Sequence, residues 1–333
     1  MKNFEMMMPE SVDQALELLP TRPSWAGVDT VILAGGQDLV PEMKEHLVEP
    51  DRVVNLKSTG ELRGHSIRAD GAASIGALVT LAELARDPAF QVRYPVLTEA
   101  AGSVGSAQIR SQATVGGNLC QRPRCWYYRD ENTVCLKKGG TECFSYAGMN
   151  KYNAVLGGGP SYIVHPSDLA PALISLDAMV RVRGPEGERQ VALQDFYVLP
   201  SEADDVTRET VLAPGDIVTD IEVPAHSATW RSTYLKFQEK GSFDFALGAV
   251  AVAVRLDGNA IAEARVCLGG VAPVPWRCRT TEQLLLGRTI DDETCRLAAD
   301  DALRGAEPLD HNAYKIPLTK GLLTRALKSL AEA

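Results

Sequence analysis

The sequence predicts an α+β protein of more than one domain. Segments of strand and helix character follow one another without the strict strand–helix alternation of a doubly wound sheet. The 333 residues suffice for two or three domains, and 45% hydrophobic and 23% charged residues are ordinary for a globular protein. A break in the pattern near Pro224 predicts a first domain over residues 1–224 and a smaller second domain over residues 225–333.

The first domain begins with short elements whose ends are marked by capping and turn residues. Ser11 with Gln14, and Thr80 with Glu83, have the spacing of capping boxes ahead of two helices, VDQALELL and LAELARD. Apolar runs and a turn at Asp70-Gly71 predict strands and a hairpin. These fall at residues 28–33 and 53–57 and, for the hairpin, at 66–78.

The second domain is read as strands followed by helices. YLKFQEK and ARVCLGGVAPVPWR have strand character, whereas FALGAVAVAVRL fits a buried strand or a buried helix. Three helices close the chain, at residues 280–287, 291–305 and 318–333.

Charge and hydropathy exclude several classes of function. The formal net charge of −9 argues against a nucleic-acid-binding protein and against docking on an anionic membrane. We find neither a signal peptide at the N-terminus nor an apolar run of 18 residues, so no membrane insertion is expected. We expect a cytoplasmic protein, or a periplasmic one if a partner subunit carries the export signal.

Two glycine-rich turns are candidate cofactor sites. Residues 32–39, ILAGGQDL, follow a buried strand, and residues 114–118, TVGGN, repeat the pattern of a polar residue and two glycines. Adjacent glycines let a backbone approach a ligand closely, and free N–H groups of such a turn bind a pyrophosphate. Taken alone, each also fits an ordinary tight turn, since neither matches the GxGxxG fingerprint.

Four of the seven cysteines fall within 24 residues, in a segment without helix or strand period. They are Cys120, Cys125, Cys135 and Cys143. Four thiolates bind zinc or an iron–sulfur cluster, and the spacing departs from the short knuckles of zinc sites. We therefore favour a 4Fe–4S cluster on a cysteine loop at about residues 119–160. A zinc-stabilised binding or scaffold subunit without redox chemistry is the alternative of another class.

Two further segments have ordinary interpretations when taken alone. Ser167 or Asp168 fits the N-cap of the apolar helix LAPALISL, and His165 fits a core position. Lys236, on a predicted strand, fits a solvated surface charge.

Taken in order, these motifs resemble a known family. ILAGGQDLVPEMK, SAQIRSQATVGGNLCQ, HPSDLAPALISLDA, LKFQEKGSFDFALGAVAV and CLGGVAPVPWR are similar to the FAD-binding subunits of the xanthine dehydrogenase and carbon monoxide dehydrogenase family of molybdenum hydroxylases. The resemblance implies a two-subdomain FAD-binding fold of the vanillyl-alcohol-oxidase type and a smaller C-terminal α/β domain.

The resemblance also implies a set of FAD contacts, and no residue that reacts with the organic substrate. The first turn would wrap the pyrophosphate and ribityl chain, and Asp168 would bind the sugar or adenine side. The implied positions are Ile32, Leu33, Ala34, Gly35, Gly36, Gln37, Asp38, Leu39, Val104, Thr114, Gly117, Asn118, Asp168, Val218 and Lys236. No His or Cys lies in residues 26–40, which argues against a stand-alone oxidase with covalently linked FAD.

The cysteine loop is similar to an insert in the flavin subunits of 4-hydroxybenzoyl-CoA reductase and periplasmic-type aldehyde oxidoreductases, where it binds a 4Fe–4S cluster. Those relatives often carry a cysteine where this chain has Ser161. Cys125, Cys135 and Cys143 are thus the better-supported cluster ligands. The fourth ligand is either Cys120 or a Ser161 oxygen, or the cluster has only three protein ligands.

The implied function is electron transfer within a complex. A molybdopterin-containing large subunit would oxidise an aldehyde or an N-heterocycle such as a purine. Electrons would pass through 2Fe–2S clusters of a small subunit to FAD, and on to ferredoxin, a quinone, NAD or oxygen. The alternative is the flavin subunit of a 4-hydroxybenzoyl-CoA reductase-type complex, with electrons flowing in the opposite direction.

Overall fold

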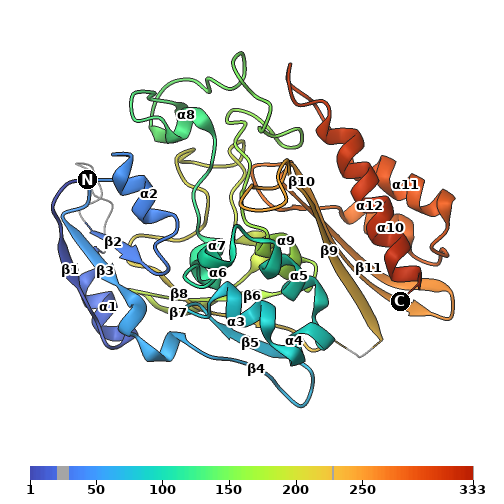
Figure 1. Cartoon of the computed structure of the whole chain (residues 1–333), viewed down its shortest axis with the longest axis horizontal. Coiled ribbons are helices and arrows are strands. Elements are labelled where there is room, and N and C mark those ends of the chain that lie inside the picture. The colour runs from blue at the N-terminus through green and yellow to red at the C-terminus, as the bar shows by residue number, and fades with distance from the viewer. Residues whose placement is uncertain (21–29, 227–228, 333) are drawn as a thin grey trace.

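The computed structural model describes residues 1–20, 30–226 and 229–332, and it confirms the mixed α+β class. Three separate sheets are arranged in chain order across the molecule (Figure 1). A small parallel sheet lies at the N-terminal end, a five-stranded antiparallel sheet lies in the middle, and a four-stranded antiparallel sheet lies at the C-terminal end.

The N-terminal sheet is formed by β1 (Glu5–Met7), β3 (Arg52–Asn55) and β2 (Thr30–Leu33), in that order and all parallel. Helices α1 (Val12–Leu18) and α2 (Leu39–Lys44) accompany it. The expected strand at 28–33 is found from Thr30 onward, and its first two positions lie outside the described residues. The strand expected at 53–57 ends at Asn55, and a 3-10 turn (Leu56–Ser58) follows.

One of the two expected capping boxes is complete. Thr80 accepts a hydrogen bond from the backbone of Glu83, whose carboxylate accepts one from Thr80 N at 2.7 Å. At the first helix, Ser11 caps Gln14 N, but the Gln14 side chain accepts from Glu10 N rather than from Ser11. Only half of that predicted box therefore forms.

The central sheet has the order β4-β5-β8-β6-β7. Its strands are β4 (His65–Ile67), β5 (Ala73–Gly76), β8 (Ile217–Val223), β6 (Met179–Gly184) and β7 (Gly187–Ala192). The predicted hairpin turn at Asp70-Gly71 joins β4 to β5. Six short helices accompany this sheet: α3 (Leu81–Arg86), α4 (Pro88–Arg93), α5 (Pro95–Ser103), α6 (Ala107–Arg110), α7 (Val115–Leu119) and α9 (Leu169–Ile174). A further short helix, α8 (Trp126–Arg129), lies in the cysteine loop.

The C-terminal sheet has the order β12-β11-β10-β9, and helices α10–α12 pack on one of its faces. Its strands are β9 (Trp230–Phe237), β10 (Gly248–Asp257), β11 (Ala260–Gly269) and β12 (Trp276–Arg277). The helices are α10 (Arg279–Leu285), α11 (Asp292–Ala302) and α12 (Lys315–Glu332).

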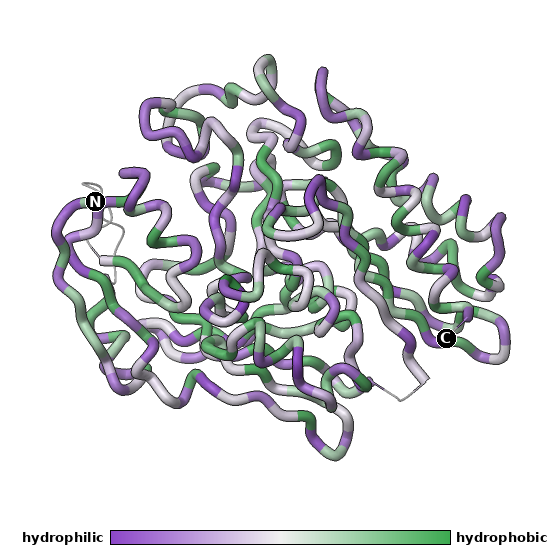
Figure 2. The backbone as a smooth tube through the Cα atoms, viewed as in Figure 1, coloured by the Kyte–Doolittle hydropathy of each residue, from purple (hydrophilic) through white to green (hydrophobic). Residues whose placement is uncertain are grey.

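Strand β10 separates two hydrophobic cores. Its alanines, such as Ala249 and Ala251, join the core shared with the central helices. Its valines, such as Val250 and Val252, join the core beneath α10–α12. Both faces of GAVAVAV are thus buried, which explains why the sequence alone fits either a strand or a helix, and why the segment is continuously apolar in Figure 2.

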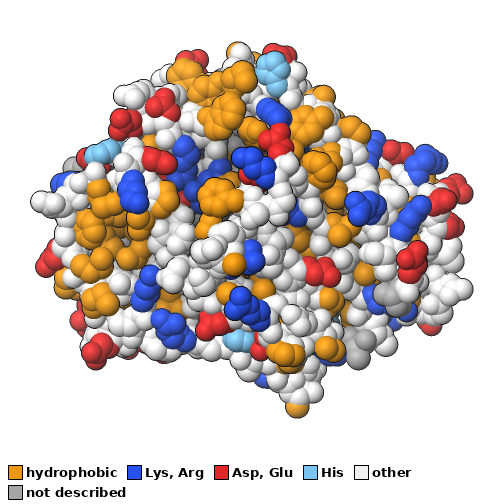
Figure 3. All heavy atoms as spheres, viewed as in Figure 1, with side chains coloured by type: hydrophobic (Ala, Val, Ile, Leu, Met, Phe, Trp, Pro, Cys, Tyr) orange, Lys and Arg blue, Asp and Glu red, His pale blue; other side chains and the backbone are white. Residues whose placement is uncertain are grey.

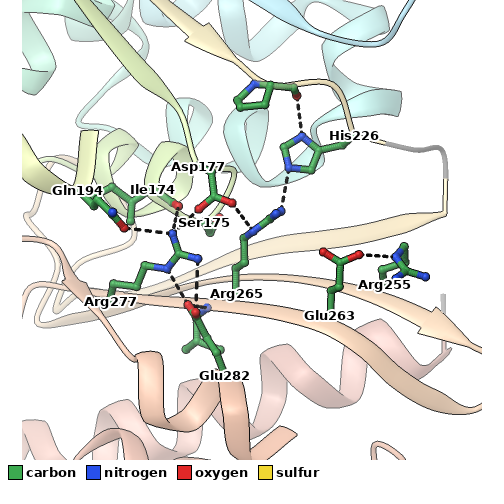
Figure 4. Close-up of polar contacts among 12 residues, drawn as sticks. Ile174, Ser175, Asp177, Gln194, His226, Arg255, Glu263, Arg265, Arg277 and Glu282 are labelled. Atoms are coloured by element: carbon green, nitrogen blue, oxygen red, sulfur yellow. Dashed lines mark hydrogen bonds and ion pairs between the residues drawn. The ribbon is translucent and has the colours of Figure 1, made fainter. Parts of the chain in front are cut away.

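A polar network joins β11 and β12 to the end of α9 (Figure 4). The Asp177 carboxylate forms ion pairs with Arg265, whose Nε lies 2.6 Å from Oδ2, and with Arg277. Arg277 also pairs with Glu282 at 2.8 Å, and both of these side chains are largely buried. The C-terminal sheet is therefore tied to the central part of the chain by charged contacts as well as by apolar packing.

The cysteine loop is mostly irregular, with α8 and a 3-10 turn (Leu136–Lys138) as its regular parts. Residues 150–155, near the end of this loop, are hydrogen-bonded to residues 307–315, which lead into α12. Among these bonds, Asn312 donates to the carbonyls of Asn153 and Ala154, and Lys315 donates to the carbonyl of Tyr152 at 2.8 Å. The loop therefore rests on the C-terminal region (Figure 1).

Candidate functional site

A cavity of about 450 Å³ lies where the two glycine turns meet. Its wall includes residues of the N-terminal sheet, of β8 and β9, and of the cysteine loop. Fourteen of the fifteen predicted FAD positions line it, and Leu33 is the exception. The fourteen are Ile32, Ala34, Gly35, Gly36, Gln37, Asp38, Leu39, Val104, Thr114, Gly117, Asn118, Asp168, Val218 and Lys236.

Glycines of both turns lie too close to neighbouring segments to carry a side chain. A Cβ on Gly35 would lie 2.3 Å from the carbonyl oxygen of Gln112. Gly36 has a φ of +76°, which favours glycine. A Cβ on Gly116 would lie 2.8 Å from that of Ala77. The glycines therefore serve close backbone packing around the cavity.

The second turn is organised by side-chain hydrogen bonds. Thr114 caps α7 and accepts from Gly117 N at 3.2 Å. Asn118 accepts a 2.6 Å bond from Ser167, whose hydroxyl also caps Ala170 N at 3.0 Å. Of the two candidate caps of α9, Ser167 thus makes the bond and Asp168 makes none. Asn118 of the second glycine turn and Ser167 ahead of α9 are 49 residues apart in sequence, and this bond joins them at the cavity wall.

Asp168 is free of the helix cap because it is held by β9. It accepts from Tyr234 Oη at 2.6 Å and from Lys236 Nζ at 2.8 Å. Only 5% of each charged side chain of the pair is exposed, so the interpretation of Lys236 as a solvated surface charge is wrong. Lys236 also donates to the carbonyl of Ser103 at 3.2 Å, which ties α5 to the pair.

Tyr234 is a site residue that the sequence analysis did not identify. Burial, and next the Asp168 charge, raise the pKa of its hydroxyl, so it stays protonated and donates to that carboxylate. Its position two residues before Lys236 places both on the same face of β9, which was the available signal.

His165 and Cys120 are buried near the cavity in uncharged form. Burial lowers the pKa of His165 to about 3, and its ring packs edge-on against Tyr197 with a centroid separation of 4.4 Å. Burial raises the pKa of the Cys120 thiol to about 12. Cys120 lines the cavity of the glycine turns, apart from the other loop cysteines.

The three remaining loop cysteines share a different neighbourhood. Asn153 Nδ2 lies 3.7 Å from the Cys125 sulfur and 3.0 Å from the carbonyl oxygen of Tyr162, and Tyr162 N lies 3.5 Å from the Cys143 sulfur. Cys135 is buried, and the neighbouring Cys125 contributes to raising its thiol pKa, after burial. In the described parts of the chain, no three His, Cys, Asp or Glu side chains form a group that could hold a metal ion. The loop as it stands does not fit a closed four-thiolate cage.

A second cavity, of about 370 Å³, adjoins the first and shares six lining residues with it: Arg124, Pro166, Asp168, Phe243, Asp244 and Phe245. Apolar side chains that line it are also exposed at the surface, among them Trp126 and Met149 of the cysteine loop. Figure 3 shows hydrophobic side chains gathered along the upper edge of the molecule, over this loop.

The first cavity has the chemistry that FAD requires. Backbone N–H groups of the first glycine turn suit a pyrophosphate, and apolar residues such as Ile32 and Val218 suit aromatic rings. The N–H groups of the second turn, from Val115 to Asn118, are hydrogen-bonded within the protein. Among residues 1–20, 30–226 and 229–332, no helix is long and apolar enough to cross a membrane.

Comparisons with known proteins agree with this geometry. Residues 2–226 match the family described as the FAD binding domain in molybdopterin dehydrogenase, and residues 232–330 match the CO dehydrogenase flavoprotein C-terminal domain. The aldehyde oxidoreductase FAD-binding subunit PaoB of Escherichia coli (strain K12) is 34% identical over 89% of each chain. The carbon monoxide dehydrogenase medium chain of Hydrogenophaga pseudoflava is 28% identical over 98% of this chain and 96% of its own.

Solved structures show the same architecture. A chain of the H. pseudoflava carbon monoxide dehydrogenase structure superposes with a TM-score of 0.76 at 27% identity, covering 98% of this chain and 97% of that one. From the matched family models and these relatives, the chain belongs to the FAD-binding subunits of the molybdenum hydroxylases, a family of oxidoreductases.

Proposed function

We propose that this subunit binds FAD in the first cavity and carries electrons between 2Fe–2S clusters of a partner subunit and an external acceptor. A molybdopterin-containing large subunit of the same complex oxidises the organic substrate. The observation that carries the proposal is the convergence of fourteen predicted FAD positions, drawn from six separate segments, on one cavity.

FAD, when bound, supplies the capacity to take up and release electrons singly or in pairs. The chain's part is to hold the cofactor and set its surroundings. The first glycine turn would offer backbone N–H groups to the pyrophosphate. Asp168, fixed by Tyr234 and Lys236, would hold the sugar or adenine side with its buried carboxylate.

The first test is the composition of the native complex. Gentle purification followed by flavin and metal analysis should give one FAD per copy of this chain, with molybdenum and iron in the partner subunits. A complex that is active and free of flavin would contradict the proposal.

The substrate class that we propose for the complex is an aldehyde. The support is the similarity to PaoB, named as part of an aldehyde oxidoreductase, which exceeds that to the carbon monoxide dehydrogenase medium chain. Assays of the assembled complex with aldehydes, purines and aryl-CoA thioesters separate this proposal from an N-heterocycle hydroxylase and from a 4-hydroxybenzoyl-CoA reductase-type enzyme. Turnover of purines alone would overturn it.

We also propose, on the sequence pattern, that the cysteine loop binds a 4Fe–4S cluster through Cys125, Cys135 and Cys143. The position of Cys120 at the FAD cavity favours Ser161, or no residue, in the fourth place. Because the described thiols are not assembled into a cage, we assign no electron path through this cluster.

Variants distinguish the candidate ligands. Cys125→Ser should lower the iron and sulfide content by the amount of one cluster, whereas Cys120→Ser should leave it unchanged. Ser161→Cys should retain the cluster and slow its loss to chelators. One zinc per chain, with neither iron nor sulfide, would instead support the zinc-stabilised scaffold.

The boundary between residues 224 and 225 and the cytoplasmic location are part of the same proposal. Limited proteolysis with mass analysis of the fragments tests the boundary. Cell fractionation of the assembled complex tests the location.

A further inference from the structure

Asp38 stands at the end of the first glycine turn, directly before α2, and lines the FAD cavity. It occupies the N-cap position, but its side chain makes no capping hydrogen bond. The carboxylate faces the cysteine loop instead. Its partners there all belong to the arginine segment, which we define as residues 122–129.

Three groups of the arginine segment converge on this one carboxylate. Arg122 N donates to Oδ2 at 2.6 Å, and both Arg124 and Arg129 contact Oδ1 at 2.8 Å. Arg129 also donates to the carbonyl of Pro123 at 2.7 Å, which fixes the turn that carries the other two arginines. Asp38 therefore holds the backbone and two side chains of the segment.

The contacts lie away from bulk solvent. The exposed fraction is 17% for the Asp38 side chain, 14% for Arg129 and 23% for Arg124. Charge-assisted hydrogen bonds of this kind are short, and they are screened less than surface pairs. Nearby, Glu42 accepts a bond from Tyr128 at 3.3 Å, so α2 is joined to the same segment.

The arginine segment is also part of the cavity wall. Arg122 and Arg124 line the cavity together with the glycine turn. Arg122 is held from its other side by Glu209 at 2.7 Å. A displacement of the segment would therefore open one wall and leave Asp38, at the end of the glycine turn, without its partners.

We propose that Arg124 and Arg129, together with the backbone N–H of Arg122, position FAD through Asp38, so that FAD binding and the ordering of the arginine segment favour each other. This inference rests on the proposed function, since it requires FAD in the first cavity. Because coupling between two equilibria is reciprocal, FAD must protect the segment to the extent that the segment strengthens FAD binding.

The first experiment is a double-mutant cycle on the full chain, with FAD affinity as the readout. Asp38→Asn and Arg129→Gln each remove one charge with little change in volume, and each should weaken FAD binding about tenfold, as expected for a lost charge-assisted bond. The double variant should be no weaker than Asp38→Asn alone, because that variant already removes the charged contact with Arg129. Additive losses, or unchanged affinity in both single variants, would overturn the proposal.

Arg255→Gln is the matched control. It removes an arginine paired with Glu263 at 2.7 Å on the β10–β11 hairpin, away from the cavity. Its FAD affinity should equal that of the wild type. Circular dichroism on all variants identifies any that fail to fold.

The second experiment measures the coupling from the other side. Amide hydrogen exchange of residues 122–129 should slow on addition of FAD in the wild type, and much less in Asp38→Asn. If amide hydrogen exchange of this segment in the wild type is the same with and without FAD, the positioning role is wrong. A wild-type chain that fails to bind FAD at all would instead overturn the proposed function.

Discussion

Lys236 and Asp168 form an ion pair that is almost completely withdrawn from solvent. Loss of one partner leaves a buried charge without compensation, which costs about 3 kcal/mol or more. We expect Lys236→Met to lower the free energy of unfolding by that amount in urea titrations. The double variant with Asp168→Asn should recover part of it, because no unpaired charge remains. Equal losses in the single and double variants would contradict this account.

Lys315 is a buried cation whose ammonium donates to the carbonyls of Tyr152 and Gly270, and no carboxylate pairs with it among the described residues. Burial lowers its pKa from 10.5 to about 7. Between these values the unfolded chain binds more protons than the folded one, so this group makes the free energy of unfolding rise with pH. Urea titrations at pH 7, 8 and 9 should show wild-type stability increasing relative to Lys315→Met. A constant difference between the two proteins would show that Lys315 does not titrate in this range.

At the residue scale, the sequence predicted the positions of the site better than their partners. Fourteen of the fifteen positions assigned through motif order gather at one cavity. The Tyr234 hydroxyl and the Asp38 contacts were missed, because they depend on which strand faces which loop across 66 and 84 or more residues. Lys236 was misjudged on its own because composition does not reveal a buried partner.

The first glycine turn shows how an element depends on its neighbour. Gly35→Ala would place a Cβ 2.3 Å from the carbonyl oxygen of Gln112, on the adjacent backbone, which cannot move as a side chain would. We expect a loss of about 1–3 kcal/mol in stability, as for other overpacked sites, and a clear loss of FAD affinity. Thermal unfolding and FAD titration measure the two effects. Gly60→Ala, where a Cβ would meet nothing within 4 Å, is the control and should change neither.

Among the elements, those with strong local signals were predicted well. The Thr80–Glu83 capping box and the Asp70-Gly71 hairpin are decided by neighbouring residues and form as expected. Strand β10 remained ambiguous because both of its faces are buried, so no polar residue marks its period. The path of the cysteine loop was unpredictable, because it is set by hydrogen bonds to residues about 160 positions later.

At the scale of the whole molecule, Arg277 joins the C-terminal sheet to the end of α9 through Asp177 while holding the buried Glu282 (Figure 4). Arg277→Met would leave Glu282 without its closest partner. We expect a loss of about 3 kcal/mol and, in calorimetry, an earlier unfolding of the C-terminal part. Arg255→Met is the control, since Arg255 pairs with Glu263 at 2.7 Å on the β10–β11 hairpin, outside this network. A similar loss in both variants would show that the network does not join the two parts.

The hydrogen bonds between residues 150–155 and residues 307–315 also bear on how the protein is made. Residues 150–155 of the cysteine loop leave the ribosome about 160 residues ahead of the segment to which they are hydrogen-bonded. At ordinary rates of synthesis this is a delay of roughly ten to thirty seconds. During that interval residues 150–155 lack these partners. Delivery of cofactors to this part of the molecule therefore belongs after residues 307–315 have been made, and a chain truncated before residue 307 should be synthesised without acquiring them.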